Sequence, residues 1–352
     1  MPITAGDLAT VSVHALDNYM RNKPVDQIGT ERPLIKKLMA GRKKLMPARQ
    51  YSVANVRNGY GSNFAWSFGE SARSFNKRST VDQAQFPWRV ALDGLYLPWD
   101  MLFAAGIEVV PDSASKGNVK PSANEQVILS NMLTEHMEVL EAGFLEKLDI
   151  ELHRDGSAST DAIVGLDTLI SRTPSAASAV GGLDPSAKTY WRNYFTGTVS
   201  NANLRAQMEL AWRACIRNGG APDFILAGST FIDAYAASVT LTQNTDAGKP
   251  KTVDIATGRG NRTGLFFKGV EIVWDPTFSV LDTLEAPAST VLWEKRCYFI
   301  NTKHLKYEDD GMSVYNPPSP HNVRATYASL DLRCALKTDR RNAHALIICT
   351  GS

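Results

Sequence analysis

The stretch SANEQVILSNMLTEHMEVLEAGFLEKLDIELHR, residues 122–154, carries the strongest structural signal in this chain. Ser122 and Glu125, just after a proline, form a capping-box pattern that marks the start of a helix. Gly156 follows as a stop signal. Between these points apolar residues recur at helical spacing: Leu129, Met132, Leu133, Met137, Leu140, Phe144 and Leu148. We expect one helix of roughly 33 residues, about 50 Å long, on which other elements lie.

Upstream of this helix, residues 50–98 have the pattern of a long β-hairpin. Phe64, Trp66 and Phe68 alternate with small or polar residues, which is the period of a strand with one apolar face. The polar and basic stretch GESARSFNKRST, residues 69–80, forms the predicted tip, and the alternation then resumes at Phe86, Trp88, Val90 and Leu92. Because an isolated hairpin is marginally stable in water, these aromatic side chains predict a covering surface in the same domain or in another subunit.

The first 49 residues have the pattern of an arm. Residues 4–20 predict a helix, which Pro24 ends. The segment ERPLIKKLMAGRKKLMPAR, residues 31–49, contains seven basic residues and one acidic residue, and it predicts a helical turn, a break at Gly41 and a basic stretch. Contact with nucleic acid, a solvated face and a patch between subunits are all compatible with this composition.

Helix and strand signals alternate in the second half of the chain. Short strands are expected at 161–170, a helix at 201–218, a short apolar strand at 222–229 and a further helix at 230–238, which together suggest an α/β layer. Residues 239–263 predict a long polar loop. The helix at 201–218 has one apolar face, formed by Leu204, Met208, Ala211, Trp212 and Cys215. From residue 264 the sequence predicts strands: LFFKGVEIVW, TVLWEKRCYFI, RATYASLDLRCALK and HALIICT.

Composition bounds the class of protein. The chain has 352 residues, 43% of them hydrophobic, and a net charge of +2, so it can bury a core and shows no global preference for nucleic acid. Residues 1–90 carry 14 basic and six acidic side chains, which leaves the remainder acidic. These parts are complementary if copies of the chain touch, although a merely soluble basic arm fits equally well.

Signals for export, membrane insertion and disulfide bonding are missing from the sequence. Four widely spaced cysteines predict free thiols in a reducing compartment. The N-terminus has no signal-peptide pattern, and no apolar run approaches about 20 residues, so we expect no membrane partner.

Catalytic and metal-binding motifs are missing as well. The sequence contains no HExxH, CxxC, GxxxxGK[ST] or GxSxG. His136 is the best isolated candidate, but Glu135 beside it points to a different face of the helix. Asp309 and Asp310 precede Gly311 and resemble a tight turn more than a calcium loop. We therefore expect no enzyme, no cofactor and no metal site.

The order of these parts resembles the major capsid proteins of tailed bacteriophages, whose fold is named after phage Hong Kong 97. The stretch LRAQMELAWRACIRNGGAPDFILAGSTFIDAY, residues 204–235, looks like the helix, Gly-Gly turn, strand and helix of that family's axial domain. Residues 122–154 are similar to its spine helix, and residues 61–97 to its extended loop. The stretch ATYASLDLRCALKTDRRNAHALIICTG resembles the closing strands of its peripheral domain.

The resemblance implies an α+β, Hong Kong 97-like capsid fold. In that fold residues 1–49 would be the N-terminal arm, 50–98 the extended β-hairpin loop and 161–299 the axial α/β domain. Residues 99–160 and 300–352 would form the peripheral domain with its spine helix. The implied function is a major capsid protein that self-assembles into hexamers and pentamers of an icosahedral head enclosing double-stranded DNA.

The resemblance also implies partners and a location. The first partner is the chain itself, and the others are portal protein, decoration proteins and packaged DNA on the inner face, bound without sequence specificity. Because the arm begins almost at Met1, we expect any scaffold to be a separate protein. The location is the virion, assembled in the host cytoplasm. Some relatives crosslink through a Lys–Asn isopeptide, but beyond Lys77 at the predicted tip nothing identifies the other groups, so crosslinking is not expected.

In this interpretation the hairpin lies over an adjacent subunit, and residues 239–263 face the centre of a capsomer. Aromatic side chains supply apolar area, and basic side chains of the tip meet acidic residues of the spine helix. The predicted contact residues are Phe64, Trp66, Phe68, Trp88, Arg73, Lys77, Arg78, Glu135, Glu138 and Glu141.

Three alternatives remain at this stage. The first is a nucleic-acid-binding protein that uses residues 31–49 with Tyr51, Tyr60 and Trp66 as stacking platforms. The second is an enzyme of unknown class built on residues 200–280, which a pocket with perturbed acids or bases would support. The third is another virion part, such as a minor capsid protein.

Overall fold

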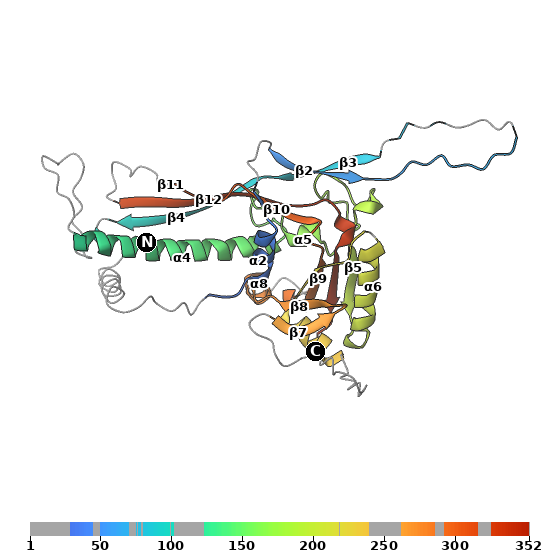
Figure 1. Ribbon diagram of the computed structural model, residues 1–352. Coiled ribbons are helices and arrows are strands. Elements are labelled where there is room, and N and C mark those ends of the chain that lie inside the picture. The colour runs from blue at the N-terminus through green and yellow to red at the C-terminus, as the bar shows by residue number, and fades with distance from the viewer. Residues whose placement is uncertain are drawn as a thin grey trace, which may run out of the picture. The chain divides into compact units, whose positions relative to one another are not determined.

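The structure is a computed structural model (Figure 1). It describes residues 29–44, 50–69, 75, 77–78, 80–98, 100–101, 123–217, 219–238, 262–285, 292–315 and 325–351, without side chains at 123–133, 262–263 and 326. The chain divides into two compact units. The described part of unit 1 lies in Val90–Leu148 and Gly311–Arg333, and that of unit 2 in Glu31–Arg89, Asp149–Asp310 and Cys334–Ser352.

Several predicted features lie outside the described residues. These are the helix at 4–20, the side chains of the capping box at Ser122 and Glu125, residues 239–261 of the predicted loop at 239–263 and the basic side chain of Arg73. They stay predictions.

The long helix is confirmed. Helix α4 spans Ala123–His153, 31 residues, and Leu148 is its last residue in unit 1. Phe144 and Leu148 are buried and Met137 is half-buried, as the predicted apolar face requires. Glu138 and Glu141 on the intervening positions are exposed, so the helix has the expected two faces.

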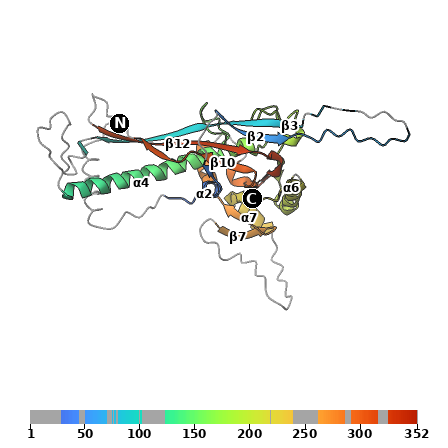
Figure 2. The ribbon, with the colours of Figure 1, turned by 45° about the horizontal axis from the view of Figure 1, so that its top comes forward.

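The strands of unit 1 run alongside this helix, as both views show (Figures 1 and 2). They are β4 (Arg89–Pro98), β11 (Ser313–Tyr315) and the first part of β12 (Ala325–Thr338). Strand β12 pairs with β4 and, antiparallel, with β11, where Val314 lies opposite Leu330. Leu330 and Leu332 are buried, which defines the inner face of this sheet.

Unit 2 contains a six-stranded mixed sheet with the order β5-β13-β9-β6-β8-β7. Strand β13 is parallel to β5 and antiparallel to β9, and β6 is antiparallel to β9 and parallel to β8. The strands are β5 (Tyr194–Val199), β6 (Phe224–Ala227), β7 (Arg262–Phe267), β8 (Val270–Trp274), β9 (Arg296–Ile300) and β13 (Ala345–Cys349).

The main core of unit 2 lies between this sheet and two helices, α6 (Leu204–Arg217) and α7 (Ser229–Ser238). All five residues predicted for the apolar face of α6 are buried. Trp212 of that face meets Phe267 and Phe299 edge-on, at ring-centroid distances of 5.8 and 6.5 Å. The predicted α/β layer is therefore confirmed.

The remaining elements of unit 2 surround this layer. Strand β1 is parallel to β10, and β10 is antiparallel to the last part of β12. The elements are α2 (Pro33–Ala40), β1 (Lys43–Lys44), β2 (Tyr51–Arg57), β3 (Val81–Pro87), α5 (Leu166–Leu169), η2 (Thr189–Trp191), η3 (Asn201–Asn203), α8 (Thr277–Glu285), η4 (Trp293–Lys295), β10 (Leu305–Asp309) and η5 (Arg341–Ala343).

Two local predictions are wrong. The strands expected at 161–170 are absent from this fully described stretch, where Leu166–Leu169 form the short helix α5. A short apolar run does not distinguish a strand from a buried helical turn. Asp309, predicted in a turn with Asp310 and Gly311, is buried in strand β10 and lies opposite Cys334 of β12. Strands β10 and β11, on either side of Gly311, both run antiparallel to β12, so the chain does not reverse direction there.

The predicted hairpin is confirmed only at its base. Strands β2 and β3 pair antiparallel from Tyr51 opposite Pro87 to Arg57 opposite Val81. The aromatic stretch 63–68, which was predicted as a strand, lies outside every helix and strand of the described chain. The alternating pattern therefore forms no strand among the residues that the structure describes.

Candidate functional site

The loop that joins β2 and β3 can be followed in Figure 1, and its described residues expose large apolar side chains. Phe64, Trp66 and Phe68 are 75%, 91% and 101% exposed, and Tyr60 and Phe75 are exposed as well. The rings of Phe64 and Trp66 meet edge-on, with their centroids 5.2 Å apart. A soluble monomer seldom exposes so much contiguous apolar area, so this loop has the composition of an interaction surface.

The base of this loop is held firmly in unit 2. Phe86 and Ala84 of β3 are buried, and the main-chain N–H of Gln85 donates to the Gly181 carbonyl at 2.9 Å. This bond ties the hairpin to the segment 155–193. The loop therefore projects from an ordered support.

A carboxylate at the start of β3 strengthens the same attachment. Asp82 accepts hydrogen bonds from the hydroxyl of Tyr190 and from Lys188 Nζ, the latter at 2.9 Å. The bonds from Tyr190 and Lys188 hold the pKa of Asp82 below its usual value. Burial and the bond to Asp82 raise the pKa of Tyr190.

The predicted basic contact residues are exposed where the structure describes them. Lys77 and Arg78 are both exposed, and the side chain of Arg78 lies next to Gly61 on the opposite arm of the loop. Trp88 is only half-buried rather than exposed, and its main-chain N–H donates to the Gln50 carbonyl at 3.3 Å. Trp88 therefore offers less free apolar area than the three aromatic residues of the loop.

The predicted acidic partners lie on α4 in unit 1. Glu138 and Glu141 are exposed and Glu135 is half-buried. The predicted contact joins two copies of the chain, so it stays a prediction.

The basic segment at 31–49 is partly engaged within the chain. Lys37 lies 4.0 Å from Asp223, and Arg42 lies 3.8 Å from the buried carboxylate of Asp309. The helix α2 in this segment buries Leu34, Ile35 and Leu38. These side chains belong to the fold of unit 2, which weakens the interpretation of the whole segment as a nucleic-acid surface.

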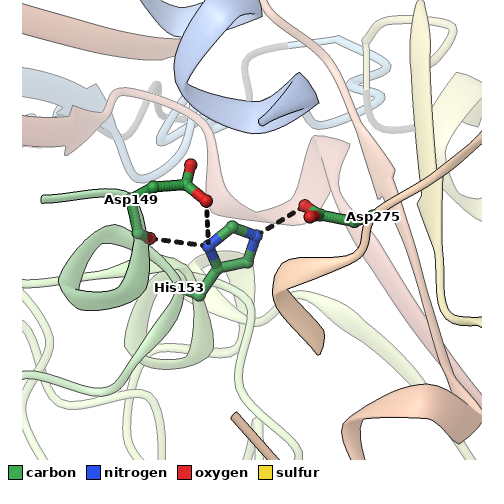
Figure 3. A group of neighbouring side chains, drawn as sticks. All are labelled: Asp149, His153 and Asp275. Carbon is green, nitrogen blue, oxygen red and sulfur yellow. Dashed lines mark hydrogen bonds and ion pairs between the residues drawn. The ribbon is translucent and has the colours of Figure 1, made fainter. Parts of the chain in front are cut away.

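A second candidate site was missed by the sequence analysis. Asp149, His153 and Asp275 form a fully buried cluster in unit 2 (Figure 3). His153 Nε2 lies 2.8 Å from Asp275 Oδ2, and Nδ1 lies 2.7 Å from the main-chain oxygen of Asp149. The sequence does show an Asp and a His four residues apart at the end of a long helix. The third member, Asp275, lies 122 residues after His153, so nothing in the sequence groups it with them.

The cluster joins the ends of three helices. His153 is the last residue of α4, where the helix dipole favours a cation. Asp149 accepts from the main-chain N–H of Ile35 in the first turn of α2 at 3.3 Å and from Thr277 Oγ1 at 2.7 Å. Asp275 accepts from the N–H of Thr277, the first residue of α8, at 3.0 Å. Each carboxylate therefore accepts a main-chain hydrogen bond at the N-terminus of a helix, where the helix dipole favours an anion.

The same geometry argues against a metal ion at this cluster. The two carboxylates lie on opposite sides of the imidazole, one at each ring nitrogen (Figure 3). A single cation binds only one ring nitrogen and would meet only one of the carboxylates. With hydrogen-bond acceptors beside both nitrogens, the arrangement fits a doubly protonated imidazolium.

The charge of His153 predicts how stability depends on pH. Burial alone would lower the pKa of His153, but the carboxylates of Asp275 and Asp149 raise it to about 9. The stabilisation is therefore complete below the ordinary value of about 6.5 and is lost as the pH rises through about 9. We expect the free energy of unfolding to fall by on the order of 3 kcal/mol over this interval.

Urea unfolding between pH 6 and pH 10 measures this effect. The matched control is His153→Gln, whose free energy of unfolding should lack the fall that deprotonation of His153 causes. Burial raises the pKa of Asp149, so titration of that carboxylate also lowers the stability as the pH rises, beginning near its ordinary value of 3.8. Parallel pH profiles for the two proteins would show that His153 carries no charge.

A cavity of about 430 Å³ lies beside β5, and its lining includes Asp155, Asp167 and Arg172. Burial raises the pKa of Asp167, against the effect of Arg296, whose Nη1 lies 3.3 Å away. The hydroxyl of Tyr298 also donates to Asp167, at 3.2 Å. The perturbed acid is thus part of a structural ion pair, and it lies outside residues 200–280, where an enzyme site was considered.

Comparisons with known proteins bear on the fold. No family model and no curated protein matches the sequence. Among solved structures, the cyanophage A-1(L) capsid asymmetric unit aligns over 93% of this chain and 95% of its own, with a TM-score of 0.61 and 13% identity. A structure from Mycobacterium phage Ogopogo covers 95% of this chain and 98% of its own, with a TM-score of 0.54 and 11% identity.

The chain has the capsid-protein fold of tailed bacteriophages. The capsid of a native GTA particle is also similar, with a TM-score of 0.50 and 12% identity over 96% of this chain and 98% of the other. The expectation of a Hong Kong 97-like α+β fold is therefore confirmed. No helix in the described part of the chain is both long and apolar enough to cross a membrane.

Proposed function

We propose that this chain is a major capsid protein that self-assembles into hexamers and pentamers of an icosahedral phage head enclosing double-stranded DNA. The observation that carries this proposal is the agreement of the fold with phage capsid structures over nearly the whole chain. The exposed aromatic loop supports it, because such a surface needs a partner. Many weak, repeated contacts then give a shell of high kinetic stability.

In the proposed subunit, residues 1–49 form the arm, 50–98 the extended loop, 161–299 the axial domain and the remainder the peripheral domain. Phe64, Trp66 and Phe68 supply apolar area to a neighbouring copy, and the basic residues of the loop meet Glu135, Glu138 and Glu141. The proposed location is the virion, after assembly in the host cytoplasm. A separate scaffold, portal and decoration proteins, and packaged DNA on the inner face complete the set of partners.

Expression of the chain alone tests the proposal. We expect capsomers, tubes or closed shells in negative-stain electron microscopy, and matching high-mass species in size-exclusion chromatography. A chain that stays monomeric at every concentration, with and without crowding agents, would count against self-assembly. Salt-dependent binding to DNA would then be the next measurement, because it separates a nucleic-acid-binding protein from a shell protein.

Replacing Trp66 with alanine is expected to impair assembly without impairing folding. The side chain is 91% exposed in the single chain, so its removal leaves the fold of unit 2 intact. Buried aromatic anchors at interfaces contribute about 2 kcal/mol or more, which corresponds to about a 30-fold higher concentration for assembly. Light scattering against concentration measures this shift.

The conservative variant Trp66→Phe serves as the control and should assemble close to the parent concentration. Thermal midpoints of both variants should match the parent. Normal assembly of Trp66→Ala would remove Trp66 from the interface.

A further inference from the structure

The cavity of about 430 Å³ beside β5 has a lining of mixed character. Its apolar part includes Phe195, Val180 and Ile348, and its polar part includes several hydroxyl groups and three charged side chains. All of the lining residues belong to unit 2. Pockets of about 300 to 1,000 Å³ that combine an apolar part with a few convergent polar groups commonly hold small organic molecules. The cavity is therefore large enough for such a ligand.

The buried carboxylate of Asp167 has its two oxygens in different surroundings. Oδ1 accepts from the hydroxyl of Tyr298 at 3.2 Å and from Arg296 Nη1 at 3.3 Å, and neither of these residues lines the cavity. Oδ2 lies 3.6 Å from Nη2 of Arg172, which does line it. At that distance the two groups form an ion pair but no hydrogen bond. Within the described chain Oδ2 therefore keeps its capacity as an acceptor, although the side chain is only 9% exposed.

The guanidinium of Arg172 complements this oxygen. In the part of the chain that the structure describes, the side chain of Arg172 forms the ion pair with Asp167 and no hydrogen bond, so its N–H donors are available. A ligand hydroxyl can donate to Asp167 Oδ2 and accept from Arg172 at the same time, because a hydroxyl is both a donor and an acceptor. The pair is therefore suited to a hydroxyl group.

The edge of β5 adds main-chain polar groups to the same cavity. Strand β5 lies at the end of its sheet and pairs only with β13 among the described strands. Thr196 and Thr198 lie opposite consecutive residues of β13, so Gly197 between them is the extra residue of a β-bulge. The extra residue of a bulge is left unpaired in the ladder. Gly197 and Phe195 both line the cavity, which places polar groups of the strand edge beside an aromatic ring.

The charges of the lining favour a neutral ligand. An anion would meet the carboxylates of Asp155 and Asp167 and only one cation, Arg172. A cation would be repelled by Arg172, and the charge of Asp167 is already balanced by the ion pair with Arg296. The other polar side chains of the lining are uncharged hydroxyls: Thr168, Ser171, Thr173, Ser178 and Thr198.

We propose that this cavity binds a small neutral saccharide. A saccharide ring carries hydroxyl groups around its edge and C–H groups on its faces, so it matches both parts of the lining. One hydroxyl bridges Asp167 and Arg172, others bind the hydroxyl side chains and the edge of β5, and a C–H face packs on the ring of Phe195. This binding site adds a ligand to the proposed shell subunit and does not depend on assembly.

Saturation-transfer NMR of the full chain with lactose, maltose and N,N′-diacetylchitobiose tests the class of ligand. We expect signal transfer to at least one of these disaccharides, with a dissociation constant of about 1 mM or lower. Inorganic phosphate and glycine represent anionic and zwitterionic ligands, and neither should displace the saccharide. Transfer to none of the three disaccharides would overturn the inference, and so would displacement of the saccharide by phosphate or glycine.

Two variants test the position of the ligand. Arg172→Gln removes the cation of the bridging pair and should weaken saccharide binding about ten-fold. Gly197→Met should abolish binding, because its side chain fills the cavity. Within the described chain a Cβ at Gly197 would approach only the edge of the Phe195 ring, at 3.9 Å, and the backbone of Gly197 is outside the left-handed region, so the replacement is not strained.

The matched control is Arg213→Gln. Arg213 also forms an ion pair, with 3.7 Å between its Nε and Glu209 Oε2, but it lies on α6 and does not line the cavity. Arg213→Gln should bind the saccharide as tightly as the parent, and the thermal midpoints of all three variants should match the parent. Equal binding by Arg172→Gln, Gly197→Met and the parent would place the saccharide elsewhere on the chain and overturn the assignment of this cavity.

Discussion

Replacement of Arg341 by methionine is expected to lower the free energy of unfolding by about 3 to 5 kcal/mol. The guanidinium is buried and donates three hydrogen bonds to main-chain carbonyls in unit 2. Nε bonds to Leu169 at 2.7 Å, Nη1 to Trp191 at 3.2 Å and Nη2 to Thr168 at 3.1 Å. The variant would leave three buried acceptors without donors, and each costs about 1 to 3 kcal/mol if it finds no substitute.

The charge of Arg341 is retained in this setting. Burial lowers its pKa to about 10, which still leaves the side chain protonated at neutral pH. Three carbonyl dipoles therefore solvate a buried cation, and they hold α5, η2 and η5 together. A hydrophobic side chain of similar length fills the space but cannot make these bonds.

The neighbouring residue provides the control. Arg340 is exposed, and its side chain makes one hydrogen bond, from Nη1 to the Gly219 carbonyl at 3.1 Å. Arg340→Met should cost less than about 1 kcal/mol. Urea denaturation of both variants under the same conditions gives the difference, and similar midpoints for the two would refute the role assigned to Arg341.

Arg341 also shows where sequence reasoning ends. It lies in TDRRNAHAL, a polar stretch in which two adjacent arginines have the same local pattern. One is exposed and the other is buried, because the acceptors of Arg341 come from residues about 150 to 170 positions away. Contacts between residues so far apart in the chain cannot be predicted from the local sequence.

The elements that sequence did predict share a different property. Helix α6 was found because its apolar face, from Leu204 to Cys215, packs within the same unit at helical spacing. Helix α4 was found for the same reason. In these cases local periodicity and burial agree, so the pattern alone is sufficient.

The stretch 63–68 has equally clear periodicity and is not a strand in the single chain. An alternating pattern predicts that one face of the segment is covered and the other is exposed, but it does not say whether the same chain or another chain covers that face. The strands wrongly predicted at 161–170 failed for a simpler reason, since Ile163 and Leu166 are buried by packing of a loop and the short helix α5.

Replacement of His153 by leucine is expected to destabilise the chain by about 3 to 5 kcal/mol at pH 7. The imidazole is fully buried between Asp149 and Asp275, and it carries the cation that both carboxylates need. Leucine is similar in size, so little of the effect comes from packing. It comes from two buried anions that lose their counter-charge.

Because Asp149 also caps α2, the damage should spread to that helix. Hydrogen exchange of residues 33–40 should become faster in His153→Leu than in the parent, beyond the change caused by lower global stability. His136→Leu is the matched control on α4: His136 is half-buried and should tolerate the change within about 1 kcal/mol.

A double variant separates charge from packing. Adding Asp275→Asn to His153→Leu removes one of the stranded anions, so the pair should cost less than the sum of the two single variants by about 1 to 3 kcal/mol. Strict additivity would mean that His153 is neutral and that Asp275 holds α8 without it. The pH profile would then be flat through pH 9 as well, so two independent measurements address the same imidazolium.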